Sequence, residues 1–155
     1  MKKKNYINLA KKAANIQIKE LKKINKVFNK SFVKAIDLIL NCKGKVIFAG
    51  VGKSGIIARK ISATFSSVGI PSFFCDPAQA LHGDMGQIEK KDILIIFSYS
   101  GNTSELSNML RYANRSRIKI IGATSKSDSL LLKASDVKLL LQNSCTKFFK
   151  PWASV

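Results

Sequence analysis

The chain has 155 residues, 46% of them hydrophobic and 23% charged, which fits about one globular domain and excludes a mainly disordered, collagen-like or disulfide-rich secreted chain. Its formal net charge is +18, but only four of its 27 basic residues are Arg. Because Arg is the preferred residue for phosphates and bases, we interpret the charge as Lys on solvated faces and expect no nucleic-acid partner, with nucleic-acid binding as the alternative.

The sequence predicts a cytoplasmic protein with no membrane attachment. No apolar run approaches the roughly 20 residues that cross a bilayer. Asn5, Asn8 and Lys11 follow the basic start of the chain, where a signal peptide would be apolar. The Cys residues have neither paired nor metal-ligand spacing, which indicates reduced thiols.

Residues 4–41 contain neither Gly nor Pro and carry apolar residues at helical spacing, with Lys on the other face. Asn29-Lys30-Ser31 divides this segment into two predicted helices, with Ser31 as the N-cap of the second. A long amphipathic helix in this position packs against a partner subunit or covers its own core, and both alternatives stay open. The apolar stripe of the first helix consists of Ile7, Ala10, Ala14, Ile18, Leu21, Ile24 and Phe28.

From residue 45 onward, short apolar runs alternate with helical stretches, which predicts an α/β fold. The expected architecture is a three-layer αβα sandwich with five parallel strands and helices on both faces. Ligands of such sheets bind beyond the carboxyl ends of the strands, so the loops after the first three strands are candidates. We predict strands at 46–49, 72–75, 93–97, 118–122 and 137–141, and helices near 54–68, 78–86, 103–115 and 127–134.

The first predicted strand ends in the glycine-rich segment 50–55, Gly-Val-Gly-Lys-Ser-Gly. This matches the dinucleotide-binding pattern between a strand and a helix, and Asp76 stands where a ribose-binding carboxylate would lie. A dinucleotide site is therefore one hypothesis, and a plain tight turn is another. Lys53 favours a third, because an ammonium group inside the turn suits a sugar phosphate or a developing oxyanion.

The third predicted strand is followed by residues 98–105, Ser-Tyr-Ser-Gly-Asn-Thr-Ser-Glu. Hydroxyl groups and exposed N–H groups at a helix N-terminus bind phosphate without Arg, whereas simple capping by Ser100 or Asn102 is the alternative. His82, the only His of the chain, lies beside Asp84 in a glycine-flanked loop. It is a candidate acid, base or substrate-binding group, and a structural role is the alternative.

These loops together resemble one family. The segments Gly-x-Gly-Lys-Ser-Gly, Pro-Ser-Phe-Phe, Ala-x-His-Gly-Asp-x-Gly and Ser-x-Ser-Gly-x-[ST]-Ser-Glu resemble the sugar isomerase (SIS) domain of bacterial D-arabinose 5-phosphate isomerases. The resemblance runs from about residue 45 to 141. It implies a flavodoxin-like sheet and interconversion of D-ribulose 5-phosphate and D-arabinose 5-phosphate, which feeds synthesis of the lipopolysaccharide or capsule sugar Kdo. It also implies a homo-oligomer, a tetramer or dimer, that requires no organic cofactor.

The resemblance also assigns roles to individual residues. Lys53, Glu105 and His82 match catalytic positions. Asp76 stands where the family has a His linked to zinc, so Asp76 is a candidate metal ligand, with zinc as an inhibitor or structural ion. The residues assigned to substrate or phosphate binding are Gly52, Ser54, Gly69, Ile70, Ser98, Ser100 and Thr103.

We expect three segments: N-terminal helices at 1–44, the SIS domain at 45–141 and an atypical tail at 142–155. The family's second catalytic Glu, a downstream His and two CBS domains have no counterpart in the tail. We therefore expect a C-terminally truncated chain with a frameshifted end and weak turnover, and a genuine short family member is the alternative. A non-catalytic sugar-phosphate-binding module and a dinucleotide-binding fragment are the competing functions.

Overall fold

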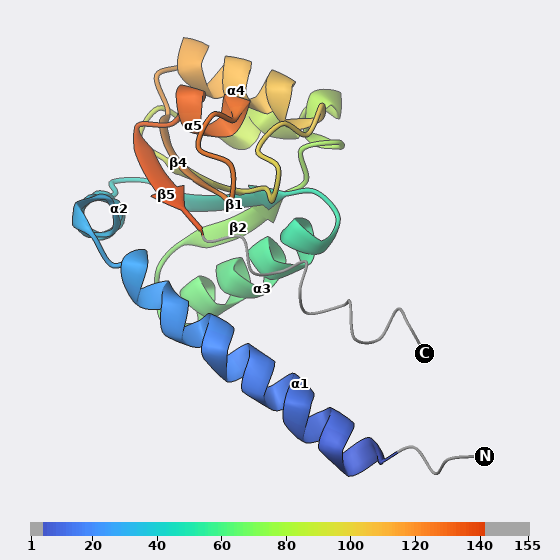
Figure 1. Cartoon of the computed structure of the whole chain (residues 1–155). Coiled ribbons are helices and arrows are strands. Elements are labelled where there is room, and N and C mark those ends of the chain that lie inside the picture. The colour runs from blue at the N-terminus through green and yellow to red at the C-terminus, as the bar shows by residue number, and fades with distance from the viewer. Residues whose placement is uncertain (1–4, 142–155) are drawn as a thin grey trace.

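The computed structural model describes residues 5–141, apart from the side chain of Leu81 (Figure 1). The expected atypical tail, residues 142–155, lies outside the described residues. A five-stranded parallel sheet has the order β2-β1-β3-β4-β5, which confirms the predicted α/β class. The strands are β1 (Val46–Gly50), β2 (Ser72–Cys75), β3 (Ile93–Phe97), β4 (Lys119–Thr124) and β5 (Val137–Leu140).

The central strands are apolar runs because helices cover both faces of the sheet. Every residue of β1 is buried, and in β3 only Phe97 is partly exposed. Strands of this kind are read from the sequence as continuous apolar segments, and each predicted strand bound lies within two residues of the observed one.

Two helices cover each face of the sheet (Figure 1). On the face of α2 and α3, Ala35 and Ala58 belong to the same buried cluster as Phe48, and the rings of Phe48 and Phe65 meet edge to face at 5.0 Å. Full burial of one such side chain stabilises the fold by about 1.5–3 kcal/mol. On the other face, Leu110 of α4 joins the core beneath α4 and α5. The four helices are α2 (Lys30–Leu40), α3 (Lys53–Ser67), α4 (Leu106–Arg115) and α5 (Leu130–Ala134).

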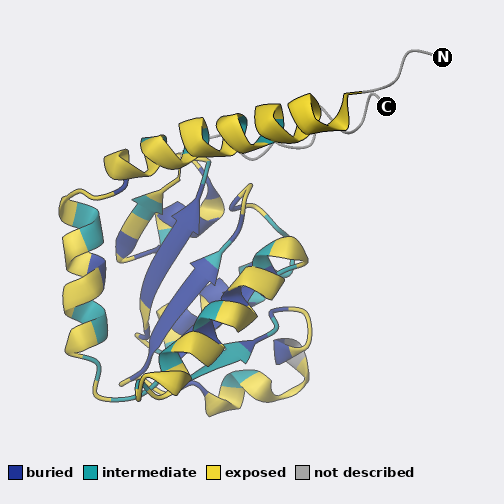
Figure 2. Cartoon of the chain, turned by 90° about the horizontal axis from the view of Figure 1, so that it is seen from below, coloured by how far each residue is buried: buried dark blue, intermediate teal, exposed yellow. Residues whose placement is uncertain are grey.

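The N-terminal segment divides earlier than predicted. Helix α1 (Tyr6–Leu21) passes into a 3-10 turn, η1 (Lys22–Lys26), before α2 begins. The N-cap of α2 is Asn29 and not Ser31, because the Asn29 side chain accepts the N–H of Ser31 at 2.8 Å and Asn is among the best capping residues. No residue of α1 is buried (Figure 2), and α1 runs away from the sheet (Figure 1). Between residues 5 and 141, no helix is both long enough and apolar enough to cross a membrane.

Three predicted helices have different bounds in the structure. The segment near 78–86 forms two 3-10 turns, η2 (Ala80–His82) and η3 (Asp84–Gln87). Gly83 separates them with a φ of 127°, which an α-helix cannot include. The helices expected near 103–115 and 127–134 begin at Leu106 and Leu130. Residues 103–105 and 127–129, which were predicted to be helical, form loops.

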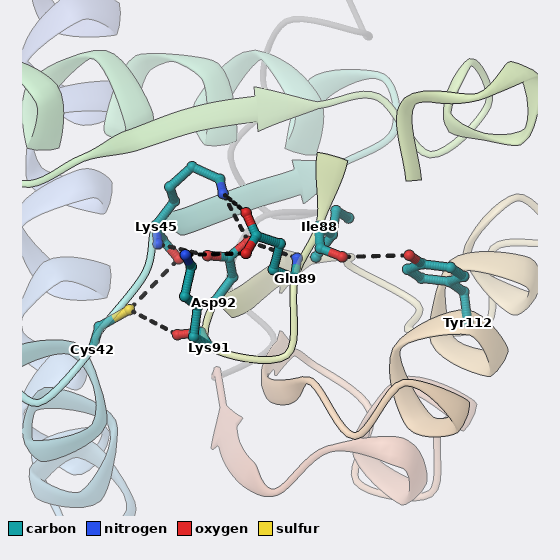
Figure 3. Close-up of polar contacts among 7 residues, drawn as sticks. All are labelled: Cys42, Lys45, Ile88, Glu89, Lys91, Asp92 and Tyr112. Carbon is teal, nitrogen blue, oxygen red and sulfur yellow. Dashed lines mark hydrogen bonds and ion pairs between the residues drawn. The ribbon is translucent and has the colours of Figure 1, made fainter. Parts of the chain in front are cut away.

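A buried carboxylate joins the amino ends of β1 and β3 (Figure 3). Asp92 accepts the backbone N–H of Lys45 at 2.7 Å and that of Glu89 at 2.8 Å, and the Lys45 ammonium lies 3.1 Å from the same carboxylate. Burial acts to raise the pKa of Asp92, but the two N–H groups and Lys45 outweigh it and hold the pKa below its ordinary value. Asp92 is therefore ionised at neutral pH and fixes the start of two neighbouring strands.

Further hydrogen bonds fix the end of the segment between β2 and β3 (Figure 3). The Tyr112 hydroxyl of α4 donates to the carbonyl of Ile88 at 3.3 Å. The Cys42 thiol lies 3.6 Å from the carbonyl oxygen of Lys45 and 3.7 Å from that of Lys91, so its single S–H can donate to either of them. The segment that carries His82 is thus anchored where it returns to the sheet.

Candidate functional site

The candidate site lies where neighbouring strands lead to opposite faces of the sheet. Gly50 pairs with Phe97 at the carboxyl ends of β1 and β3. From there β1 continues into α3 and returns as β2, whereas β3 continues into α4 and returns as β4. Doubly wound sheets bind ligands at such a switch point. Residues 51–52 and 98–105 therefore border the candidate site.

The loop after β1 presents a positive helix end. Gly52 is the N-cap residue of α3, Lys53 is exposed in the first turn and Ser54 is half-buried. The first N–H groups of a helix have no partner within it and carry the positive end of the helix dipole. The Lys53 ammonium adds a full positive charge here, which suits an anionic ligand.

The loop after β3 is held in shape by its own hydroxyl groups. Ser98 is buried, and its Oγ accepts the N–H of Gly101 and lies 3.0 Å from Thr103 Oγ1. The Ser100 hydroxyl accepts the N–H of Asn102 at 3.3 Å. Among residues 5–141, no protein group accepts the backbone N–H of Ser100, Thr103 or Ser104. The loop therefore has donors available for an anion.

Glu105 ends this loop and is the N-cap residue of α4. The capping alternative for Ser100 and Asn102 is therefore wrong, since both lie at least three residues before the N-cap position. The backbone N–H of Glu105 itself and the Ser104 hydroxyl, which donates at 2.8 Å, lower the pKa of the Glu105 carboxyl below its ordinary value. Glu105 is half-buried and carries an ionised carboxylate that can accept a proton.

His82 and Asp76 lie one strand further along the same edge, because Cys75 at the end of β2 pairs with Ala49 of β1. His82 is exposed on η2. Asp76 accepts the N–H of Ala78 at 2.9 Å. Burial, then the charges of Asp84 and Asp76, raise the pKa of Cys75 to about 11, so its thiol stays protonated and is a poor metal ligand.

Within the described residues, Asp76 belongs to no group of side chains that could hold a metal ion, and its role as a metal ligand stays a prediction. Zinc in proteins takes at least three side-chain ligands from Cys, His, Asp or Glu. No such group is assembled in the part of the chain that the structure describes.

Gly69 and Ile70 lie at the opposite edge of the sheet, which corrects their assignment to the substrate site. They precede β2. Pro71, which follows Ile70, accepts the N–H of Val46 at the start of β1. Ile70 packs against the core beneath α3. A strand of four residues separates them from the carboxyl edge, about 13 Å at the usual rise per residue.

Comparison with known proteins assigns the family. The family model described as the SIS domain matches residues 39–153. The chain is a SIS-domain protein. It is 43% identical over 135 residues to the uncharacterised protein RP505 of Rickettsia prowazekii and 37% identical over 135 residues to a probable arabinose 5-phosphate isomerase of Haemophilus influenzae. A structure from E. coli CFT073 in complex with arabinose 5-phosphate superposes with a TM-score of 0.84 at 36% identity, covering 92% of this chain and 76% of that one.

The SIS domain matches only part of its curated relatives. The alignments cover 87% of this chain, but 42% of the Rickettsia protein and 40% of the Haemophilus protein.

The family match confirms the family that the sequence motifs predicted. The glycine pattern at 50–55 could not by itself separate a SIS domain from a dinucleotide-binding domain, whereas its combination with the serine-rich loop could.

Sequence analysis missed the residues that support the serine-rich loop from β4. Thr124 and Ser125 lie at the end of β4 and directly after it, and both donate to the carbonyl of Tyr99. The available signal was a pair of hydroxyl residues at the end of an apolar run, the same signal that identified the loop after β3. Asn102 was considered only as a cap, but its side chain accepts the N–H of Leu130.

Proposed function

We propose that the SIS domain binds a sugar 5-phosphate between the loops after β1 and β3 and interconverts D-ribulose 5-phosphate and D-arabinose 5-phosphate. The loop at 98–105 carries this proposal, because it combines hydroxyl groups, available N–H groups and the ionised Glu105 at the switch point. Lys53 stands on the other loop of the same switch point. The names of the relatives support the choice of substrate.

The proposed reaction can be assigned to groups on the loops at the carboxyl edge of the sheet. Isomerisation moves a proton between C1 and C2 of the sugar through an enediol, with no net oxidation, so no redox cofactor is required. Glu105 is the proposed base, and His82 is the alternative base or the second proton donor. Lys53 stabilises the negative charge that develops on the sugar oxygen. The hydroxyl groups of Ser100 and Thr103, with the backbone N–H groups of Ser100, Thr103 and Ser104, hold the phosphate, and the buried Ser98 hydroxyl supports the loop from inside.

We further propose a cytoplasmic role in supplying arabinose 5-phosphate for synthesis of Kdo. This part of the proposal rests on the resemblance to the isomerases of that pathway. Loss of Kdo-containing glycan after deletion of the gene, with rescue by added arabinose 5-phosphate, is the result that supports it. An unchanged glycan after deletion contradicts it.

The phosphate loop can be tested by binding. The double change Ser100→Ala and Thr103→Ala should raise the dissociation constant for arabinose 5-phosphate about 100-fold or more, because it removes two hydrogen bonds to a charged group, each worth about 1.5–3 kcal/mol. Isothermal titration calorimetry measures the constant. Ser67→Ala is the matched control, since Ser67 is an exposed hydroxyl residue at the far end of α3.

Unchanged affinity in the double variant contradicts the phosphate site. Binding without conversion, in the presence of an intact loop, supports the alternative of a non-catalytic sugar-phosphate-binding module. A coupled assay on the same preparation separates these results, because it measures conversion of ribulose 5-phosphate directly.

We propose that the SIS domain is a homo-oligomer that packs through α1. A single helix of 16 residues is only marginally stable in water unless an apolar face is covered. Ile7, Ile18 and Leu21 are 68%, 53% and 67% exposed. Sedimentation at micromolar concentration should show at least a dimer, and the change of Ile18 and Leu21 to Lys should shift it toward monomer. A lone 17.1 kDa species in the unchanged protein contradicts the proposal.

A further inference from the structure

The segment at the end of β4 lies beside the serine-rich loop. β3 and β4 are neighbours, and Phe97 pairs with Ala123 at their carboxyl ends. The N–H of Ser98 donates to the carbonyl of Ala123 at 3.0 Å, so the loop leaves the sheet next to the residues that end β4. Residues 124–131 are called the support segment below.

The support segment fixes the peptide bond between Tyr99 and Ser100. The Tyr99 carbonyl accepts hydrogen bonds from the Thr124 hydroxyl at 3.0 Å, the Ser125 hydroxyl at 2.7 Å and the Ser125 N–H at 3.2 Å. A trans peptide is planar, with its N–H pointing opposite to its C=O. Because the carbonyl points at the support segment, the N–H of Ser100 points away from it.

Two further hydrogen bonds hold the next part of the loop. The carbonyl of Gly101 accepts the N–H of Leu131 at 2.9 Å, and the side-chain oxygen of Asn102 accepts the N–H of Leu130 at 2.8 Å. The fit is close, because a Cβ on Gly101 would lie 2.5 Å from the Ser129 side chain, and the φ of Gly101 is 66°. The loop therefore has little freedom to change shape while the support segment is in place.

We propose that Thr124, Ser125 and Asn102 are positioning residues that hold the loop in the conformation that binds phosphate. The inference rests on the proposed function, since it assigns the phosphate group of the substrate to this loop. The loop needs external support because several of its donors are backbone N–H groups, whose directions depend on the peptide planes. Without the support segment, these N–H groups would spread over several orientations and bind the phosphate less tightly.

The test removes the side-chain donors and keeps the shape of the segment. The combined change Thr124→Val and Ser125→Ala should raise the dissociation constants for arabinose 5-phosphate and for inorganic phosphate by the same factor, about 10-fold or more, as for other small displacements of binding groups. The KM should rise in parallel, with kcat within about twofold. A purely structural role would lower thermal stability but leave phosphate affinity unchanged well below the melting temperature.

Matched variants complete the experiment. Thr124→Ser with Ser125→Thr keeps both hydroxyl groups and should restore phosphate affinity. Ser127→Ala removes an exposed hydroxyl of the same segment that makes no hydrogen bond within residues 5–141, and it should have no effect. Because Thr124 is fully buried, the exposed Asn102→Ala serves as a second variant should the combined change prevent folding, and it should also weaken phosphate binding.

The outcomes separate the two proposals. If the unchanged protein binds arabinose 5-phosphate and the folded variants bind it equally well, the positioning role is overturned and the proposed function stands. If the unchanged protein binds neither arabinose 5-phosphate nor inorganic phosphate, the proposed function fails and the positioning role fails with it.

Discussion

Replacing Glu105 with Gln should lower the rate of sugar-phosphate isomerisation about 100- to 10,000-fold, the usual contribution of a general base. Gln keeps the size of the side chain and can still accept from the Ser104 hydroxyl, but it cannot take a proton from carbon. The affinity for arabinose 5-phosphate should therefore change much less than turnover. Exchange of the C2 proton with deuterated water, followed by NMR, reports the proton transfer even when net conversion is slow.

The control for this variant is Glu89→Gln, which neutralises an exposed carboxylate at the opposite edge of the sheet and should leave exchange unchanged. Exchange by Glu105→Gln at more than about half the original rate would exclude Glu105 as the base and leave His82 as the candidate. The pKa of Glu105 lies below its ordinary value of 4.5. The acid limb that this group causes in the pH profile should therefore also lie below pH 4.5, and Ser104→Ala should move it upward.

Replacing Asp92 with Ala should destabilise the fold by about 3 kcal/mol or more. The change leaves the backbone N–H groups of Lys45 and Glu89 without their acceptor at the start of two strands, and unpaired buried donors cost about 1–3 kcal/mol each. For a domain of this size the melting temperature should fall by about 6–12 °C. Denaturant unfolding followed by circular dichroism measures the free energy, and a loss below about 1 kcal/mol contradicts this role.

The same carboxylate should make stability depend on pH. Its pKa in the folded protein is below the ordinary 3.8, so its contribution is fully present above about pH 5 and is lost as pH falls through the lowered pKa. The stability difference between the unchanged protein and Asp92→Asn should be constant at neutral pH and shrink in acid. Glu89→Gln again serves as the control, because Glu89 is exposed and should change stability little.

The sheet could be predicted well because its signals are local. A buried parallel strand is a continuous apolar run, and each run, such as Ile93–Phe97, ends at a glycine or a polar residue. The loops at the switch point were predictable for the same reason, since residues 50–55 and 98–105 follow such runs directly. The helix expected near 78–86 was wrong because the positive φ of Gly83 is decided by the path of the loop and not by the local apolar pattern.

Contacts between strands could not be predicted in the same way. Gly69 and Ile70 are an exception, because they precede the predicted parallel strand at 72–75 and the predicted sheet already placed them at its amino edge. Their assignment to the substrate site came from the resemblance alone. The role of Ser125 depends on β4 being the neighbour of β3, which follows from the strand order. Asn102 has a capping pattern in the sequence, but its acceptor oxygen is used by Leu130, 28 residues away.

The position of α2 has a consequence for how the chain folds. Although α2 precedes β1, it packs against β5 at the far edge of the sheet. During synthesis α2 therefore emerges roughly a hundred residues ahead of β5, the strand that it packs against. Its apolar face stays exposed until nearly the whole domain has been synthesised. Because contacts between such distant residues slow folding, we expect docking of α2 on β5 to be a late step, and a chain stalled before β5 to expose α2 to aggregation or to chaperones.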